Sequence, residues 1–294
     1  MIEQFIHEGI IECSDIKSLQ TLAQQSERRI VFLDSTFVLP NSDEDIVKNF
    51  ASCHIPNALF FDIKAVADPQ SDLPHMIPEK HIFENALSEL GIHNSDIVIT
   101  YGQHGMIMGP ARVWWMFRGF GHNDVLVLNG GLPSWKEEGF ETQSGESFAI
   151  KKTNYQAKTF NQDIYTDMQC VINISEQRHC PIIDARPAER FDGSSPEPRE
   201  GMRSGSIPNS VNLPCSQLVN ADGKFKTKDE LKALFKNIGI DAEKQQQLVT
   251  TCGSGITACA LSLALFHIGI FEVAVYDGSW SEWGLESSPT KIAS

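Results

Sequence analysis

The sequence predicts an α/β protein with two similar domains, each a mainly parallel sheet flanked by helices. Three observations support this fold class. At 294 residues the chain is longer than one ordinary hydrophobic core serves. Short apolar runs such as DIVIT alternate with amphipathic segments, as in parallel sheets whose strands are buried on both faces. Finally, the two halves of the chain repeat one another.

The internal repeat consists of four pairs of segments, at an offset between 148 and 152 residues. The pairs are IVFLDST (30–36) with IIDARP (182–187), HIPNALFFDI (54–63) with SIPNSVNLPC (206–215), ITYG (99–102) with TTCG (250–253), and VLVLNGGLPSW (125–135) with VAVYDGSWSEW (273–283). We expect a first domain at residues 1–140, a polar linker at 141–167 and a second domain at 168–294.

Local signals place one helix before the third segment of each half. Thr227 and Glu230 form a capping box, and Gly239 ends the apolar face that follows it. In the first half, Pro78 can begin a helix that Gly91 stops.

The composition restricts the partners. The net charge is −14, from 24 basic and 38 acidic side chains, which disfavours nucleic acid and anionic membranes. A small anionic substrate therefore needs a local group of arginines. The start of the sequence is acidic and no apolar run reaches the roughly 18 residues of a membrane span, so we expect a cytoplasmic protein. Seven scattered cysteines without CxxC spacing favour free thiols over a zinc site.

The strongest candidate for chemistry is the segment TTCGSGITACALSLALF, residues 250–266. A strand ends at Cys252, a loop with two glycines follows, and a helix begins near Thr257. Backbone N–H groups and a helix N-terminus stabilise a thiolate in such a turn, and the thiolate is the nucleophilic form of cysteine. The alternative is a tight turn with an incidental cysteine. The first half has Tyr101 or Gly102 at the equivalent position, so only the second domain can perform thiol chemistry.

The loop CGSGITA resembles the active-site loop of 3-mercaptopyruvate sulfurtransferases, CG[ST]GVTA, with Ile256 in place of valine. The resemblance covers nearly the whole chain, including HIPNA, DLPHMIP, DARPAERF and YDGSWSEW. It implies the tandem rhodanese fold and sulfur transfer through a Cys252 persulfide. Thiosulfate sulfurtransferases carry basic residues in this loop, typically CRKGVT, whereas Gly253 and Ser254 are uncharged here.

The resemblance also assigns the substrate-binding groups. Arg190 and Arg199 match two family arginines and are expected to bind the carboxylate and keto oxygen of mercaptopyruvate, for which guanidinium geometry is suited. Surface ion pairs with Glu189, Glu197 or Glu200 are the alternative. Arg186 is expected to support the loop. The persulfide is expected to be held by the amides of residues 253–258, including Gly253, Gly255, Ile256 and Thr257.

Three further side chains are catalytic candidates. The Ser254 hydroxyl can bond the departing sulfur or the developing enolate. Family resemblance implicates His75 of DLPHM and Asp62 of FFDI, although Lys64 stands where some relatives have a second acid. Thr257 is expected to be a helix cap rather than a catalyst.

The implied reaction is a double displacement that needs no metal or organic cofactor. The donor is a small anion, and the acceptor is a thiol, thioredoxin or cyanide. Three alternatives stay open. One is a thiosulfate sulfurtransferase, and another is a non-catalytic rhodanese-like binding module. The third, a cysteine phosphatase, is disfavoured because its Cys-x5-Arg pattern would need arginine at Ala258.

Overall fold

The computed structural model describes residues 2–39, 42–145, 151–244 and 247–293. These residues form two compact units, each built on one sheet. Unit 1 consists of Met1–Ala67, Pro78–Asn161 and Ala221–Phe225, and unit 2 of Asp68–Ile77, Gln162–Asn220 and Lys226–Ser294. A short segment from each half of the sequence, Asp68–Ile77 and Ala221–Phe225, therefore belongs to the unit that the other half forms.

Unit 1 contains a five-stranded sheet of order β1-β5-β4-β2-β3, in which every strand pair is parallel. The strands are β1 (Ile10–Ile11), β2 (Ile30–Asp34), β3 (Leu59–Phe60), β4 (Ile97–Tyr101) and β5 (Val125–Leu128). The helices are α1 (Ile2–Ile6), α2 (Ile16–Gln25), α3 (Ile46–Ser52), α4 (Lys80–Glu89), α5 (Met108–Gly119) and α6 (Gly131–Glu137), with a 3-10 turn at Cys13–Asp15.

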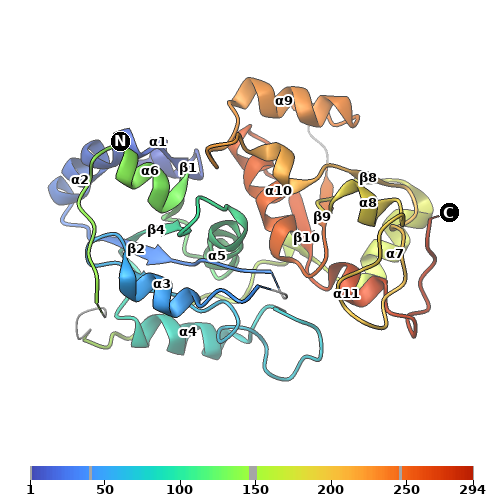
Figure 1. Cartoon of the computed structure of the whole chain (residues 1–294), viewed down its shortest axis with the longest axis horizontal. Coiled ribbons are helices and arrows are strands. Elements are labelled where there is room, and N and C mark those ends of the chain that lie inside the picture. The colour runs from blue at the N-terminus through green and yellow to red at the C-terminus, as the bar shows by residue number, and fades with distance from the viewer. Residues whose placement is uncertain (1, 40–41, 146–150, 245–246, 294) are drawn as a thin grey trace. The chain divides into compact units, whose positions relative to one another are not determined.

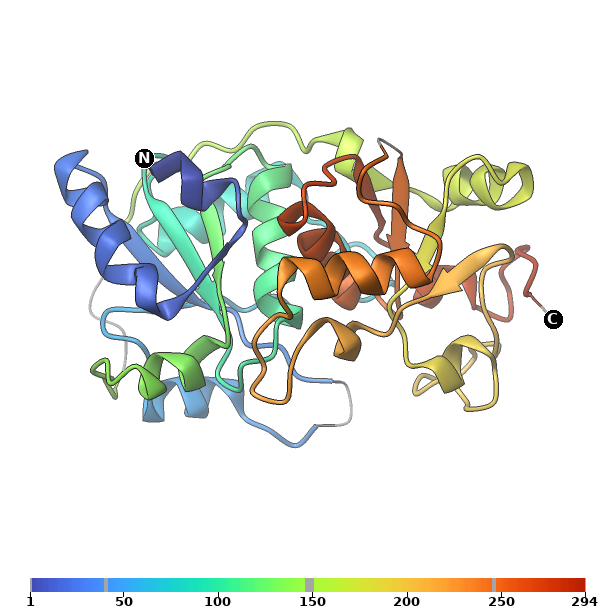
Figure 2. The ribbon, with the colours of Figure 1, turned by 90° about the horizontal axis from the view of Figure 1, so that it is seen from above.

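Helices cover both faces of this sheet (Figures 1 and 2). One core cluster joins α1, α2, α3 and α6 to alternate strand residues such as Ile97 and Ile99. On the other side, α5 contacts β4 and β5, and Phe83 of α4 meets Phe117 of α5 with ring centroids 5.3 Å apart. Burial on both faces explains why the strands read as continuous apolar runs.

Unit 2 repeats the same topology, with the strand order β6-β10-β9-β7-β8 and parallel pairs throughout. Its strands are β6 (Tyr165–Thr166), β7 (Ile182–Asp184), β8 (Ser210–Asn212), β9 (Leu248–Thr251) and β10 (Val273–Tyr276). Its helices are α7 (Met168–Gln177), α8 (Ala188–Phe191), α9 (Lys228–Asn237), α10 (Ile256–His267) and α11 (Ser279–Trp283), with 3-10 turns at Gln162–Ile164 and Cys215–Leu218, the latter labelled η3.

Helices also cover both faces of the second sheet. Val171 of α7 and Trp280 and Trp283 of α11 form a core cluster against one face, whereas α10 contacts β9 and β10 on the other. The predicted two-domain α/β fold is therefore confirmed.

Several local expectations can be compared with the structure. The capping box of Thr227 and Glu230 is present at the start of α9. Helix α4 begins at Lys80 after the cap residue Glu79, two residues later than Pro78 suggested. The stretch 141–167, expected to be a linker, ends in β6, which pairs with β10. Too few apolar residues lie in this two-residue strand to reveal it in the sequence.

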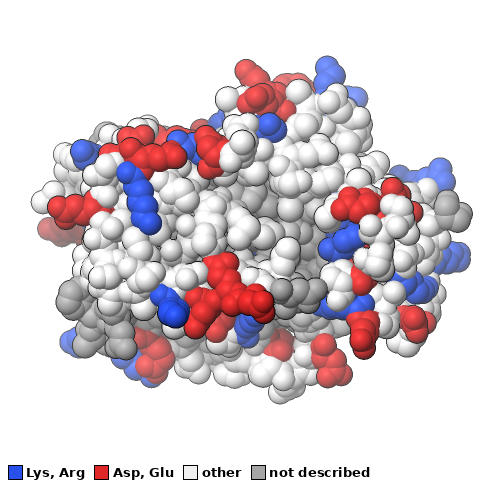
Figure 3. Space-filling view, in the orientation of Figure 1, with Lys and Arg blue, Asp and Glu red and all other residues white. Residues whose placement is uncertain are grey.

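The visible surface carries acidic and basic side chains interspersed, without one large basic patch (Figure 3). Within the described residues, no helix is both long and apolar enough to cross a membrane.

Candidate active site

Cys252 directly follows β9, at the carboxyl edge of the second sheet. Its side chain is 1% exposed. In the sheet register Thr251 lies beside Asp184 of β7, so Cys252 leaves the sheet where the neighbouring strand also ends. Helix α10 begins four residues later at Ile256. Its first N–H groups have no partner within the helix and point back towards the loop.

Ser279 anchors this loop, and the sequence analysis did not single it out. Its Oγ accepts hydrogen bonds from the N–H groups of Cys252 and Gly255, both at 3.1 Å, and donates to the Tyr276 carbonyl at 2.7 Å. The same oxygen lies 4.0 Å from the Cys252 Sγ. Ser279 is fully buried and adopts a φ of +50°, which is strained for a residue other than glycine. Glycine would adopt this φ more easily, but it would lack the hydroxyl that forms these hydrogen bonds.

The carbonyls of the loop are fixed by α11. The Trp280 N–H donates to the Cys252 carbonyl at 2.9 Å. The Gly253 carbonyl accepts from both the N–H and the hydroxyl of Ser281, at 2.8 and 2.6 Å. Helix α11 thus fixes the loop carbonyls, while the Ser279 hydroxyl fixes the loop N–H groups.

Arg190 and Arg199 both approach the loop at Gly253. A Cβ atom added to Gly253 would lie 3.2 Å from the Arg190 Nη2 and 4.0 Å from the Arg199 Nη1. Because the glycine has no side chain, two guanidinium groups can sit directly over the loop residue that follows Cys252. The structure therefore brings together the cysteine and both arginines singled out in the sequence.

Arg190 also forms an ion pair, as the alternative interpretation anticipated. Its Nε donates to both oxygens of Glu197 at 3.1 and 3.2 Å, and its Nη2 also contacts that carboxylate. Glu197 is 3% exposed and bonds the Nη1 of Arg186 at 2.7 Å as well. Arg186 in turn bonds the Asp184 carboxylate and is 1% exposed. The ion pairs orient Arg190, and Arg186 links Glu197 to Asp184, the last residue of β7.

Arg199 is held more loosely. Its Nη1 donates to the Ser281 hydroxyl at 3.4 Å. Burial and the neighbouring Arg190 guanidinium lower the pKa of Arg199, while negative charge on Cys252 acts in the opposite direction. Cys252 is therefore close enough for its charge to be felt by this cation, so two positive groups face the region where an anion would bind.

The remaining loop residues are placed as follows. Gly255 has a φ of +76° and is the residue before α10, so the cap is a left-handed glycine. The expectation that Thr257 caps the helix is wrong: it is the second helical residue and half-buried. Ile256 is 2% exposed and Ser254 is 8% exposed. Among the described residues none bonds the Ser254 hydroxyl.

Unit 1 contains the same turn without a thiol. Asp34 pairs with Tyr101 in the register where Asp184 pairs with Thr251, so Gly102, not Tyr101, is the counterpart of Cys252. The Leu132 N–H donates to the Gly102 carbonyl at 3.0 Å, as Trp280 does to Cys252. The repeat is thus an equivalence of hydrogen bonds as well as of sequence.

Comparison with known proteins identifies the family. The rhodanese-like domain model matches residues 18–138 and again 167–286. The chain belongs to the rhodanese family. It is 38% identical over 283 residues to the thiosulfate/3-mercaptopyruvate sulfurtransferase 1, mitochondrial, of Arabidopsis thaliana, covering 90% of this chain and 74% of that protein. It is 38% identical over 274 residues to the 3-mercaptopyruvate sulfurtransferase of Mus musculus, covering 92% and 91%.

A solved structure gives the same result for the fold. The 3-mercaptopyruvate sulfotransferase SseA from Escherichia coli superposes with a TM-score of 0.77 at 33% identity, covering 93% of this chain and 99% of that one. The two units are thus rhodanese domains, and only the second carries a cysteine in the loop after the strand equivalent to β9.

His75 belongs to unit 2, the rhodanese unit that contains Cys252, although it lies in the first half of the sequence. The segment Asp68–Ile77 is part of unit 2. Its Ile77 N–H donates to the Asp277 Oδ2 at 2.8 Å, two residues before Ser279. His75 itself has a φ of +63°. The structure therefore attaches the His75 segment to the loop that anchors Cys252.

Asp62 lies in unit 1, where its role is local. Its Oδ1 accepts from the Lys64 N–H at 2.8 Å and from the Ala65 N–H at 3.3 Å. This bonding forms a turn, so within its own rhodanese unit the carboxylate is a structural acceptor.

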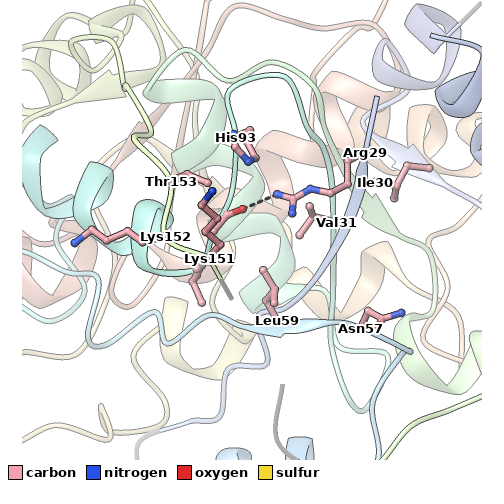
Figure 4. A pocket seen from close by; sticks show the side chains of 11 residues that line it. Arg29, Ile30, Val31, Asn57, Leu59, His93, Lys151, Lys152 and Thr153 are labelled. Atoms are coloured by element: carbon pink, nitrogen blue, oxygen red, sulfur yellow. Dashed lines mark hydrogen bonds between the residues drawn. The ribbon is translucent and has the colours of Figure 1, made fainter. Parts of the chain in front are cut away.

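The described residues include no group of three or more His, Cys, Asp and Glu side chains suited to hold a metal ion. A separate hollow of about 500 Å³ lies at the amino ends of β2 and β3 in unit 1 (Figure 4). Arg29 lines it, but its guanidinium bonds the Asp96 carboxylate and the Gly91 carbonyl. This hollow is therefore at the opposite edge of the sheet from the loop of Gly102.

Proposed function

We propose that this rhodanese-family protein transfers sulfur from 3-mercaptopyruvate to a thiol or cyanide acceptor through a persulfide on Cys252. The observation that carries the proposal is the pair of guanidinium groups over Gly253, next to the buried cysteine. The relatives from mouse and Escherichia coli, named for this donor, support it.

Binding begins with the anionic end of the donor. Arg199 has one long hydrogen bond to Ser281, which leaves most of its donors for a planar carboxylate. Arg190 is oriented by Glu197, so its remaining N–H groups are directed rather than freely rotating. Together they would overcome the overall negative charge of the protein locally.

Sulfur transfer then requires a thiolate and a stabilised leaving group. The Cys252 thiolate attacks the substrate sulfur, the carbon–sulfur bond breaks, and its electron pair passes to the enolate of pyruvate. The enolate is protonated to give pyruvate, and the persulfide stays on Cys252. The Ser254 hydroxyl is proposed to donate to the departing enolate. The N–H groups at the start of α10 hold the outer sulfur.

His75 is proposed as the proton donor to the enolate, since its segment is bonded to the loop before Ser279. Asp62 is assigned no step of the reaction, because its carboxylate closes a turn within unit 1. The acceptor in the second half-reaction is a thiol, with a thioredoxin as the physiological candidate and cyanide as its substitute in assays.

The donor assignment rests on space as well as charge. A basic side chain at position 253, as in the CRKGVT loop of thiosulfate sulfurtransferases, would meet Arg190 at the Cβ atom, 3.2 Å away. The present loop instead leaves the positive charge on Arg190 and Arg199, where it can bind a carboxylate. The name of the Arabidopsis relative includes both donors, so thiosulfate is the competing substrate to test.

The decisive experiment compares steady-state transfer to cyanide from 3-mercaptopyruvate and from thiosulfate, with Cys252→Ser as the blank. We expect a large preference for mercaptopyruvate that disappears in the variant. A preference for thiosulfate would keep the persulfide and overturn the donor. Absence of transfer from either donor would favour a non-catalytic binding module.

A further inference from the structure

A second cysteine lies beside the catalytic one. Cys215 begins the 3-10 turn η3, which follows β8 and contacts α10. Its N–H donates to the Ala185 carbonyl at 3.0 Å. The Ala185 N–H in turn donates to the Thr251 carbonyl at 2.9 Å, one residue before Cys252. A single residue, Ala185, therefore separates the backbones that carry the two thiols.

The fold does not require a cysteine at position 215. Phe61 and Leu213 occupy equivalent positions, since each donates its N–H to the carbonyl of the aspartate that ends β2 or β7, at 2.8 and 3.0 Å. The counterpart of Cys215 in unit 1 is therefore Ile63, an ordinary core residue that is 3% exposed. Unit 1 has neither of the two thiols in this arrangement, and unit 2 has both.

The two thiols differ in exposure and interact electrostatically. Cys252 is 1% exposed, whereas Cys215 is half-buried. Burial and negative charge on Cys252 raise the pKa of Cys215 to about 12. The same charge acts on Arg199. Cys215 and Arg199 thus both respond to the ionisation of Cys252, and Cys215 is the more exposed of the two cysteine residues.

We propose that Cys215 is a second sulfur carrier, which takes the outer sulfur from the Cys252 persulfide and presents it to the external acceptor. This inference rests on the proposed function, because the persulfide is its starting point. The Cys215 thiolate attacks the outer sulfur. A new sulfur–sulfur bond forms on Cys215, the bond to the Cys252 Sγ breaks, and Cys252 leaves as a thiolate. One sulfur atom moves between two cysteines, so no oxidant or reductant is consumed.

The energetics favour this direction once Cys215 loses its proton. In exchange at sulfur, a basic thiolate is a strong nucleophile and a stabilised thiolate is a good leaving group. Cys252 lies close enough to Arg199 for its negative charge to act on that cation, and α10 begins four residues after it. Deprotonation of Cys215 limits the step, so its rate rises about tenfold per pH unit at neutral and mildly alkaline pH.

The other cysteines of unit 2 provide controls. The Cys259 Sγ donates to the Gly255 carbonyl at 3.2 Å and is fully buried in the first turn of α10. Cys170 is exposed on α7. Cys259→Ala tests a buried neighbouring thiol in α10, and Cys170→Ser tests an exposed thiol.

In the first experiment, the whole protein is loaded with 3-mercaptopyruvate at several pH values between 7 and 9. Its thiols and persulfides are then blocked with an alkylating agent, and peptide mass spectrometry locates the added sulfur. We expect the mass of one added sulfur atom on both the Cys252 and the Cys215 peptides, with the share on Cys215 growing with pH. Cys252→Ser should lose both signals, and Cys215→Ser only its own. Sulfur confined to Cys252 at every pH, or reaching Cys215 equally well in Cys252→Ser, would overturn the relay.

A second measurement does not depend on the donor. Phenylarsine oxide bridges two neighbouring thiols and then resists removal by a monothiol such as glutathione. We expect stable binding to the wild type, Cys259→Ala and Cys170→Ser, and loss of it in Cys215→Ser and Cys252→Ser. If mercaptopyruvate leaves Cys252 unmodified, the donor assignment has failed. The sulfur mapping is then repeated with inorganic polysulfide as the donor. Whichever donor is used, failure of the wild type to retain phenylarsine oxide would overturn the relay.

Discussion

The role of Ser279 can be measured by removing its hydroxyl in two ways. Ser279→Ala removes the oxygen that accepts from the N–H groups of Cys252 and Gly255 in a buried site. Removing the acceptor of a buried donor costs about 1–3 kcal/mol, so with two donors we expect a loss of about 2–6 kcal/mol in the free energy of unfolding. Ser279→Gly removes the same oxygen but relieves the backbone at a φ of +50°. Left-handed backbone costs about 1 kcal/mol outside glycine, so the glycine variant should be more stable than the alanine variant by that amount.

Urea unfolding followed by circular dichroism measures both changes, with Ser262→Ala as a control at a buried serine of α10 that lies away from the loop. Transfer to cyanide should fall about tenfold in both variants if roughly 1.4 kcal/mol of the loss is expressed in the transition state. Unfolding free energies within about 0.5 kcal/mol of the wild type for both variants would refute the anchoring role. Equal stability of the alanine and glycine variants would refute the strain.

Three other predictions follow from the geometry. Gly253→Ala places a methyl group 3.2 Å from the Arg190 Nη2 and should raise KM for 3-mercaptopyruvate several-fold; an unchanged KM in steady-state assays contradicts the binding role of Arg190. Glu197→Gln removes the carboxylate shared by Arg190 and the buried Arg186, and should lower the urea-unfolding free energy by about 3 kcal/mol; wild-type stability would show that the ion pairs are weak. Burial lowers the pKa of His122 in the folded protein. The free energy of unfolding should therefore decrease as the pH falls from about 6.5, the unfolded pKa, towards the folded pKa, by at most about 1.4 kcal/mol per pH unit. His122→Gln should flatten this dependence when the free energy of unfolding is measured across pH, and an identical slope would exclude His122 as its source.

The sequence was most informative where structure is local. The loop at Cys252 joins a strand to a helix within a few residues, and its glycines restrict the backbone wherever the rest of the chain lies. The repeat then predicted two similar domains, because equivalent apolar and turn residues build equivalent strands. Arg190 and Arg199 were found by resemblance; spacing alone would have left them as surface ion pairs.

Other parts of the site depend on contacts between distant segments. Ser279 reaches Cys252 across 27 residues of sequence, and only the parallel pairing of β9 with β10 brings their ends together. The Arg190–Glu197 pair is an ion pair, as the alternative interpretation predicted. It also agrees with substrate binding, since a buried carboxylate can orient the arginine that faces the loop. The segment Asp68–Ile77 belongs to unit 2, and no local sequence pattern predicts this. Its placement decides which unit contains His75.

The two-domain α/β fold could thus be read from the sequence, which also predicts Cys252 as the nucleophile and a first repeat without thiol chemistry, because backbone periodicity and residue chemistry are local properties. The anchor of the loop, the orientation of the arginines and the second thiol near Cys252 became visible in the folded chain. Hydrogen bonds and charges act over a few ångströms in space, and residues that are 27 or 37 positions apart in the chain reach that range only after the sheet has formed.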